Sequence, residues 1–219
     1  MHKLRTISPT PMMDDNRQRR YVLLAASHGR RLVENSAKHK LVHVAYTAHS
    51  TTESIQGELN KLSHKYKIEK IFFLPSPLTH RGKLRNKKYS FFPQNVAIVV
   101  HTLLNIIVTL QTFGPVIVMD SPPRGLREHR PTSEKWDRYW SQPWYERYYH
   151  MLGLLKAFCP YITMVLWPDI LQHILSSRVD SRASPTEIER QSYDLMPDKI
   201  HLNTRSYQKW SNFILDHNE

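Results

Sequence analysis

Three residues with the chemistry of a nucleophile, a base and an acid stand at two distant points of the sequence. Ser27 lies in "YVLLAASHGRRL", residues 21–32, where an apolar run meets a turn of small residues, and Asp198 and His201 lie three residues apart in "DKIHLN". A serine whose proton is taken by a histidine, itself oriented by a carboxylate, is a nucleophile for acyl transfer. These residues are therefore a candidate triad. A plainer interpretation stays open, in which Ser27 starts a helix and Asp198 and His201 cap the last helix.

The elements that must position these residues alternate along the chain. Short apolar runs rich in β-formers are expected to be strands at 21–25, 41–46, 70–74, 115–120 and 161–167. Longer segments are expected to be helices at 29–38, 51–65, 93–111, 143–158, 168–177 and 203–217, the second with a capping box from Ser50 to Glu53. This alternation predicts a three-layer α/β domain with a five-stranded parallel sheet, order 2-1-3-4-5. We expect the domain to span 20–219, after a flexible polar and basic tail at 1–19.

Composition limits the function classes. The 219 residues include 31 Lys and Arg against 19 Asp and Glu, a formal net charge of +12, which favours an anionic partner such as nucleic acid. Colloidal solubility is the simpler alternative. The apolar run 95–111 is interrupted by His101 and Asn105 and falls short of the roughly 18 unbroken apolar residues of a membrane span, so we expect a buried helix. With Cys159 as the one cysteine and no signal-peptide pattern, we expect a cytoplasmic protein.

The order of these motifs resembles the SGNH, or GDSL, hydrolase family over roughly residues 20–217. That family carries its serine on the first strand-to-helix turn and Asp-x-x-His before the last helix, as Ser27, Asp198 and His201 stand here. The rest of its pattern is half kept. Ala25-Ala26-Ser27 replaces Gly-Asp-Ser, "AYTAHSTT" after the second strand lacks the oxyanion-hole glycine, and "FLPSPLTHRG" after the third lacks Gly-x-Asn. Losing one oxyanion donor costs roughly 10² to 10³ in turnover.

The chain combines these losses with a high positive charge and the stretches "AASHGRRL" and "DKIHLNTRSYQKW". In these features it resembles the C-terminal OSK domain family of the insect germ-plasm organiser Oskar. The resemblance implies a non-enzymatic domain without cofactors, in which Ser27, His201 and Asp198 are remnants. It implies binding of RNA, namely mRNA 3′ untranslated regions such as those of nanos and oskar, in cytoplasmic germ-plasm ribonucleoprotein granules with other germ-plasm proteins. The helicase Vasa binds that family through a LOTUS domain, which we do not expect in this chain. A serine esterase using Ser27, His201 and Asp198 remains the alternative.

Basic side chains that could contact RNA gather at three places. Arg30 and Arg31 follow the Ser27 turn, at a helix start that favours anions. The loop "HRGKLRNKKY" after the third strand carries Arg81, Lys83, Arg85, Lys87 and Lys88, with Tyr89, Phe91 and Phe92 next to them for base stacking. The loop before the last helix carries Arg178, Arg182 and Arg190. Solvated loops and surface ion pairs are the alternative interpretation. His28, His39, His43 and His49 follow no metal-ligand spacing, so we interpret them as surface or core residues.

Overall fold

The computed structural model describes residues 17–36, 40–47, 50–75, 82–83, 89–90, 96–122, 143–176, 191–192, 194–198 and 201–216. Of the residues proposed above for RNA contact, Arg30 and Arg31 lie within these ranges with their side chains, and Lys83 with its backbone alone. The other proposed residues lie outside them: Arg81, Arg85, Lys87, Lys88, Arg178, Arg182 and Arg190.

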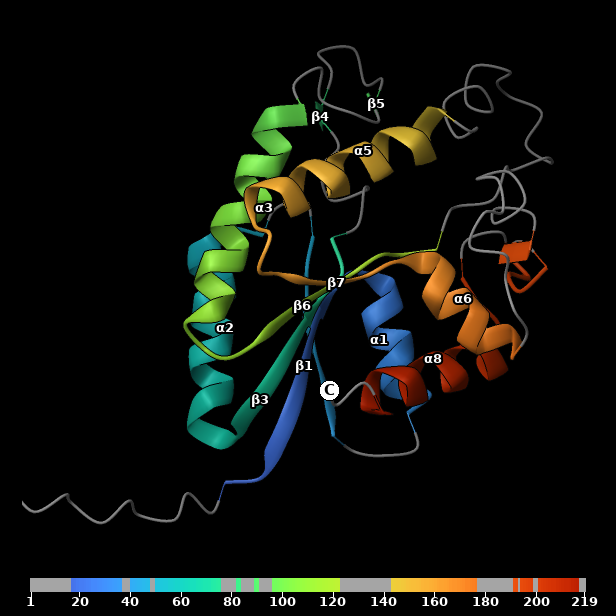
Figure 1. Ribbon diagram of the computed structural model, residues 1–219. Helices are drawn as coiled ribbons and strands as arrows, with labels where there is room; N and C mark the ends of the chain where they lie inside the picture. Colours follow the sequence, from blue (N-terminus) through green and yellow to red (C-terminus); the bar gives the residue numbers. More distant parts are fainter. Residues whose placement is uncertain are drawn as a thin grey trace, which may run out of the picture.

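A five-stranded parallel sheet forms the centre of the fold (Figure 1). Its strands, in spatial order, are β2 (Leu41–Ala45), β1 (Arg19–Ala25), β3 (Lys67–Phe73), β6 (Val116–Met119) and β7 (Thr163–Val165). This confirms the predicted order 2-1-3-4-5. A separate antiparallel pair, β4 (Gly82–Lys83) and β5 (Tyr89–Ser90), lies in the loop after the third strand and was not predicted. The first strand of the chain is therefore internal, with a neighbour on each side.

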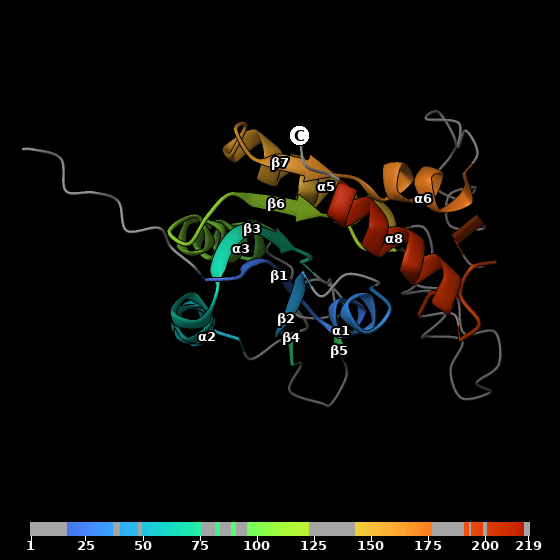
Figure 2. The same ribbon diagram turned by 90° about the horizontal axis from the view of Figure 1, so that it is seen from below.

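Helices cover both faces of the sheet, which gives the expected three layers (Figure 2). One face carries α2 (Thr52–Lys65), α3 (Val96–Gln111) and α5 (Pro143–Phe158), and the other carries α1 (Ser27–Glu34), α6 (Trp167–Leu175) and α8 (Thr204–Asp216). On the second face α8 packs against both α1 and α6. The last helix of the chain thus lies beside the first, and this contact brings the two distant motifs together.

The core follows the apolar runs of the sequence. From Tyr21 to Ala25 every residue of β1 is buried, as expected for a strand covered on both faces. Helix α3 buries Leu103, Ile107 and Leu110 completely, so the expected buried helix is confirmed over Val96–Gln111. Within the described ranges no helix is long and apolar enough to cross a membrane.

The start of α2 corrects one prediction by a single residue. Ser50 does not cap the helix, because its Oγ accepts the backbone N–H of Thr47 at 2.9 Å and closes the preceding turn. Thr51 is the N-cap: its Oγ1 accepts the Ser54 N–H at 3.2 Å, while Ser54 Oγ accepts the Thr51 N–H at 3.0 Å. A reciprocal capping box is therefore present, but between Thr51 and Ser54 instead of Ser50 and Glu53.

Gly29 allows α1 to lie close against the sheet. A Cβ at this position would lie 2.6 Å from the Ala25 Cβ and 2.7 Å from the His43 Cδ2. His43 cannot easily give way, because its Nε2 is hydrogen-bonded to the Ala25 carbonyl at 2.8 Å. The missing side chain of Gly29 therefore sets how near the first turn of α1 approaches β1 and β2.

We expect Gly29→Ala to lower the free energy of unfolding by about 1–3 kcal/mol, the usual cost of forcing a methyl group into a packed contact. Gly57, in the middle of α2, is the matched control, because a Cβ there would meet nothing within 4 Å. Gly57→Ala should raise stability by roughly 0.5–1 kcal/mol through helix propensity alone. Urea unfolding of both variants measures the difference, and equal effects would contradict the close packing at Gly29.

Candidate functional site

Ser27 occupies the first residue of α1, directly after the carboxyl end of β1. The preceding residue, Ala26, is the N-cap and offers no side-chain cap. The helix begins two residues earlier than the predicted 29. The strand order reverses at β1, because β2 lies on one side of it and β3 on the other. Ser27 therefore lies at the topological switch point of the sheet, where open α/β sheets bind ligands.

Ser27, His201 and Asp198 are hydrogen-bonded in series. His201 Nε2 lies 3.0 Å from Ser27 Oγ, and His201 Nδ1 lies 2.8 Å from Asp198 Oδ2. With the proton of His201 on Nδ1, that N–H donates to Asp198 and Nε2 accepts from the Ser27 hydroxyl. The two motifs, 174 residues apart for Ser27 and His201, therefore form the arrangement in which a histidine can remove the serine proton.

Asp198 fixes both the backbone and the ring of His201. Its Oδ1 accepts the His201 backbone N–H at 2.6 Å, while Oδ2 accepts from the ring. One carboxylate thus closes the turn and orients the imidazole. Both contacts are possible because Asp198 stands three residues before His201. The alternative role as a cap of the last helix falls to Asn203, whose Oδ1 accepts the Ser206 N–H at 2.9 Å. The His201 side chain is 18% exposed, so it is accessible while largely enclosed.

The donors available to an oxyanion are fewer than in the family pattern. Ser27 supplies its own N–H, because the first N–H groups of a helix have no acceptor within the helix. After β2, the Tyr46 N–H donates to the Ala25 carbonyl at 2.9 Å, and the Thr47 N–H donates to Ser50 Oγ. Both of these donors are used inside the fold. Positions 48–49 and 76–81, where the other family donors would stand, lie outside the described residues.

The two described arginines of the turn lie on α1 beside Ser27. Arg30 is exposed, and its Nε lies 3.6 Å from Glu34 Oε1, so part of its charge is balanced on the same helix. Arg31 is half-buried and acts on the hydroxyl of Tyr207 by its charge. The helix dipole at the N-terminus of α1 favours anions, but Arg30 is directed along the helix toward Glu34.

Two buried side chains next to the triad were not predicted as site residues. His28 is 8% exposed, and its Nδ1 lies 2.7 Å from the hydroxyl of Tyr207. Tyr207 belongs to α8 and is 179 residues away in the sequence, which is why no local pattern revealed the pair. The sequence did place His28 directly after Ser27, and that adjacency was the one available signal. Burial raises the pKa of Tyr207 well above its usual value.

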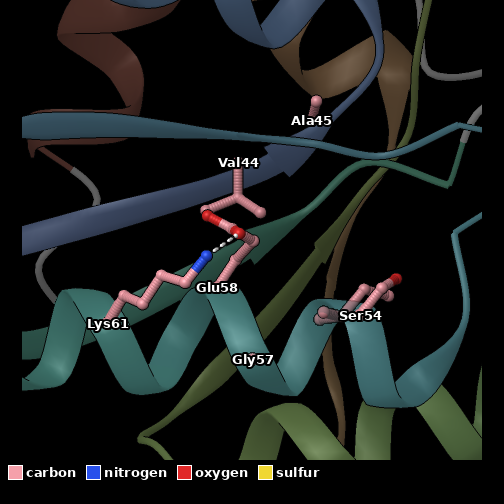
Figure 3. A pocket seen from close by; sticks show the side chains of 7 residues that line it. Val44, Ala45, Ser54, Gly57, Glu58 and Lys61 are labelled. Atoms are coloured by element: carbon pink, nitrogen blue, oxygen red, sulfur yellow. Dashed lines mark hydrogen bonds and ion pairs between the residues drawn. The ribbon is translucent and has the colours of Figure 1, made fainter.

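A separate cavity of about 420 Å³ lies between the edge strand β2 and α2 (Figure 3). Val44 and Ala45 form its strand side, and Gly57 leaves its helix side open. The ion pair between Glu58 and Lys61, 2.8 Å long, lies at the same cavity. No triad residue lines it, since α2 covers the face of the sheet opposite to α1 and α8 (Figure 2). In the part of the chain that the structure describes, no group of three His, Cys, Asp or Glu could hold a metal ion.

Several solved structures with the same architecture are named as esterases or lipases. The chain is similar to the carbohydrate acetylesterase Est24 from Sinorhizobium meliloti, with 13% identity, a TM-score of 0.51, and coverage of 91% of this chain and 97% of that one. It is similar to an aryl esterase of M. smegmatis, with 8% identity, a TM-score of 0.53, and coverage of 91% and 97%. A GDSL-like lipase from Bacteroides thetaiotaomicron gives 10% identity, a TM-score of 0.52, and coverage of 90% and 86%. This chain has the SGNH hydrolase fold. No family model and no curated protein matches it.

The expectation of a non-enzymatic domain is contradicted by this comparison, because these three structures of the same fold are named as esterases and a lipase. At 8–13% identity they establish the fold and not an activity for this chain. The expectation gave most weight to the missing glycine and asparagine of the oxyanion motifs. It gave too little to the SGNH architecture, which places Ser27 and His201 at one hydrogen bond's distance.

The buried hydroxyl of Tyr207 makes stability depend on alkaline pH. The native state keeps this phenol protonated, while the unfolded chain releases the proton near pH 10. Above about pH 10 the unfolded state therefore binds fewer protons, and the free energy of unfolding falls by up to about 1.4 kcal/mol per pH unit. We expect Tyr207→Phe to reduce this slope in urea unfolding at pH 10 to 11, with Tyr66→Phe as the control. Equal slopes in wild type and Tyr207→Phe would contradict the assignment.

Proposed function

We propose that this protein is a serine hydrolase that cleaves carboxylic esters. The observation that carries the proposal is the continuous hydrogen-bonded series of Ser27, His201 and Asp198 at the carboxyl end of β1. Structures of similar fold that are named as an acetylesterase and an aryl esterase support esters as the substrate class. The resemblance covers 91% of the chain in both cases.

The geometry supports a two-step acyl transfer. Ser27 Oγ would attack the carbonyl carbon while its proton moves to His201 Nε2, and Asp198 would stabilise the imidazolium through Nδ1–H. The oxyanion would accept the Ser27 N–H, beside the positive end of the α1 dipole. The alcohol would leave with the proton from His201, and the acyl group would remain on Ser27. A water molecule, deprotonated by His201, would then release the carboxylic acid and restore the serine.

The described part of the site offers one oxyanion donor with certainty, the Ser27 N–H. Since each further donor is worth roughly 10² to 10³ in turnover, we expect slow hydrolysis of activated esters instead of rapid turnover. Activated esters of small acids suit such a site best, because a good leaving group lowers the barrier that further donors would otherwise lower. Aryl acetates are therefore the first substrates to test.

We expect Ser27→Ala to reduce hydrolysis of p-nitrophenyl acetate to background and to abolish covalent labelling by a fluorophosphonate. Asp198→Asn should lower turnover by about 10⁴, because the imidazole loses its orienting acceptor. Ser63→Ala, which removes an exposed hydroxyl on α2, is the matched control and should match wild type. Intact-protein mass spectrometry locates the adduct. A wild-type chain that neither turns over the ester nor forms the adduct would refute the proposal, as would labelling that persists in Ser27→Ala.

We further propose that the domain binds RNA, including mRNA 3′ untranslated regions, within cytoplasmic ribonucleoprotein assemblies. Besides the net charge of +12, one described surface supports this proposal: the amino-terminal edge of the sheet. The cations of this edge are Arg19, Arg20, Lys40, Lys65 and Lys67. Arg19 lies opposite Lys67 in the register of β1 and β3, and one acidic partner, Glu69, lies 3.3 Å from Arg19.

Aromatic rings lie among these cations. The guanidinium of Arg20 lies 5.0 Å from the ring centre of Tyr66, and the ammonium of Lys65 lies 5.1 Å from the same ring. The ammonium of Lys40 lies 5.6 Å from the ring centre of Tyr21. Cations that contact phosphates, combined with a ring face on which a base can stack, are a usual means of binding single-stranded RNA. Tyr66 is half-buried and could serve in this way, whereas Tyr21 is buried and only anchors Lys40. This edge adds to the basic residues that the sequence singled out, most of which lie outside the described ranges.

Titration with labelled single-stranded 3′ untranslated RNA and with duplex DNA, each at two salt concentrations, tests the second proposal. Neutralising the edge with Arg20→Gln, Lys65→Gln and Lys67→Gln should weaken RNA binding and reduce the salt slope by roughly 0.7 per lost contact. The triple reversal of Arg81, Lys83 and Arg85 tests the loop, and Arg30→Gln with Arg31→Gln tests the turn. Lys61→Gln, on the ion-paired face of α2, is the control. Equal, weak binding to RNA and DNA in all variants would refute RNA recognition.

A further inference from the structure

His28 lies against the catalytic base without belonging to the triad. Its ring centre lies 5.5 Å from that of His201, with the two planes tilted by 57°. Because it follows Ser27 directly, its backbone shares the first turn of α1 with the nucleophile. Burying an imidazole costs more free energy than burying an apolar side chain of similar size, because its ring nitrogens must be hydrogen-bonded. This cost raises the question of what the imidazole contributes at this position.

The hydroxyl of Tyr207 sets the proton arrangement on His28. The Tyr207 hydroxyl is 2.7 Å from Nδ1 of His28, and Tyr207 is 1% exposed, so its phenol stays protonated. With the phenolic O–H as donor, Nδ1 accepts and the ring proton lies on Nε2. In this arrangement His28 is one neutral tautomer in one orientation.

The partner of His28 is itself fixed in a buried aromatic series. Tyr207 stacks on Trp210, with ring centres 6.3 Å apart and planes within 10°, and Trp210 packs edge-on against Trp167 at 5.5 Å. The Trp167 backbone N–H donates to Asp120 Oδ2 at 3.1 Å, and its indole N–H donates to Ser192 Oγ at 2.8 Å. Hydrogen bonds thus hold the far end of the series. Because Tyr207 is held in this series, the His28 ring that it contacts has little freedom to move relative to His201.

We propose that His28, held by Tyr207, is a positioning residue for His201. His201 needs Nδ1 on Asp198 and Nε2 on Ser27 at the same time, and a ring rotation would break both hydrogen bonds. The fixed imidazole of His28 blocks that rotation on one side, while Asp198 holds the ring on the other. A neutral His28 adds no repulsion when His201 becomes cationic. This role rests on the proposed hydrolase function, since it concerns the same base.

Three variants separate positioning from simple packing. His28→Leu keeps side-chain volume but removes the acceptor, Tyr207→Phe removes the donor, and His28→Asn restores an acceptor that Tyr207 can reach. For p-nitrophenyl acetate we expect kcat of His28→Leu and Tyr207→Phe to fall about 10- to 100-fold, the cost of a small misplacement, with KM nearly unchanged. His28→Asn should recover most of the loss. His173→Leu, which removes a histidine packed 5.2 Å from Phe213 on the same face, should match wild type.

A second measurement keeps the positioning role testable if the wild-type chain hydrolyses no ester. Two-dimensional ¹⁵N NMR of the histidine rings at neutral pH reports the tautomer and order of each imidazole. We expect wild-type His201 to show one Nδ1–H tautomer and His28 one Nε2–H tautomer, and His28→Leu and Tyr207→Phe to give mixed or exchange-broadened His201 signals. Thermal unfolding confirms that each variant folds.

The two possible failures have different signatures. If wild type hydrolyses no ester but His201 is ordered and His28→Leu disturbs its NMR signals, the hydrolase proposal is refuted. The positioning contact between His28 and His201 would then still stand. An active wild type whose kcat and His201 signals are unchanged in His28→Leu would overturn the positioning role alone. A His28→Asn variant as impaired as His28→Leu would also overturn it, because the acceptor for Tyr207 would then not matter.

Discussion

The close approach of α1 to the sheet at Gly29 is the contact on which the candidate site depends. Because no Cβ stands between the helix and Ala25 or His43, the chain turns from β1 into α1 within one residue, Ala26. That short turn places Ser27 at the start of a helix, where its hydroxyl lies 3.0 Å from His201 Nε2 and its N–H has no acceptor within the helix. A longer turn or a wider helix-to-sheet distance would move the nucleophile away from His201, which comes from a different part of the chain.

The second requirement is that α8 return to α1 in a fixed position. Its N-terminal turn is held by Asn203, whose backbone N–H donates to the Leu195 carbonyl at 2.8 Å and whose side chain caps the helix. The same end of the helix carries Tyr207, which reaches His28. The triad is therefore a consequence of packing between the first and last helices. Large buried rings between them, Trp210 above all, make that packing stiff, because interiors of this density leave few alternative arrangements.

The architecture could be predicted from the sequence because each strand is a short apolar run with its own turn signals. Strand order followed, since alternating strands and helices permit few topologies. The cap of α2 was wrong by one position because Ser50 and Thr51 are both competent caps, and the choice depends on the turn at Thr47. The pair of His28 and Tyr207 could not be predicted, because neither residue carries a local signal of a contact 179 residues away.

The expectation of an inactive domain shows where motif reasoning loses information. Missing glycine and asparagine residues are visible in the sequence, whereas the position of a backbone N–H that could serve as an oxyanion donor is not. Conversely, the three-residue spacing of Asp198 and His201 occurs often by chance. It indicates a catalytic pair here because the turn that Asp198 closes directs the His201 ring at Ser27. The arrangement of Ser27, His201 and Asp198 therefore says more about whether acyl transfer can occur than the motif residues that are missing.

The proposed ester site and the basic edge proposed for RNA lie at opposite ends of β1, whereas Arg30 and Arg31, also proposed for RNA contact, lie beside Ser27. Ser27 follows the carboxyl end of β1, while Arg19 and Arg20 begin the same strand at its amino end. Seven extended residues at about 3.3 Å each separate the two by roughly 20 Å. Charges on the surface are screened over about 8 Å at physiological salt, so the basic edge changes little at the triad. One sheet can therefore carry a nucleophile at one end and a polyanion at the other, and mutations can separate them.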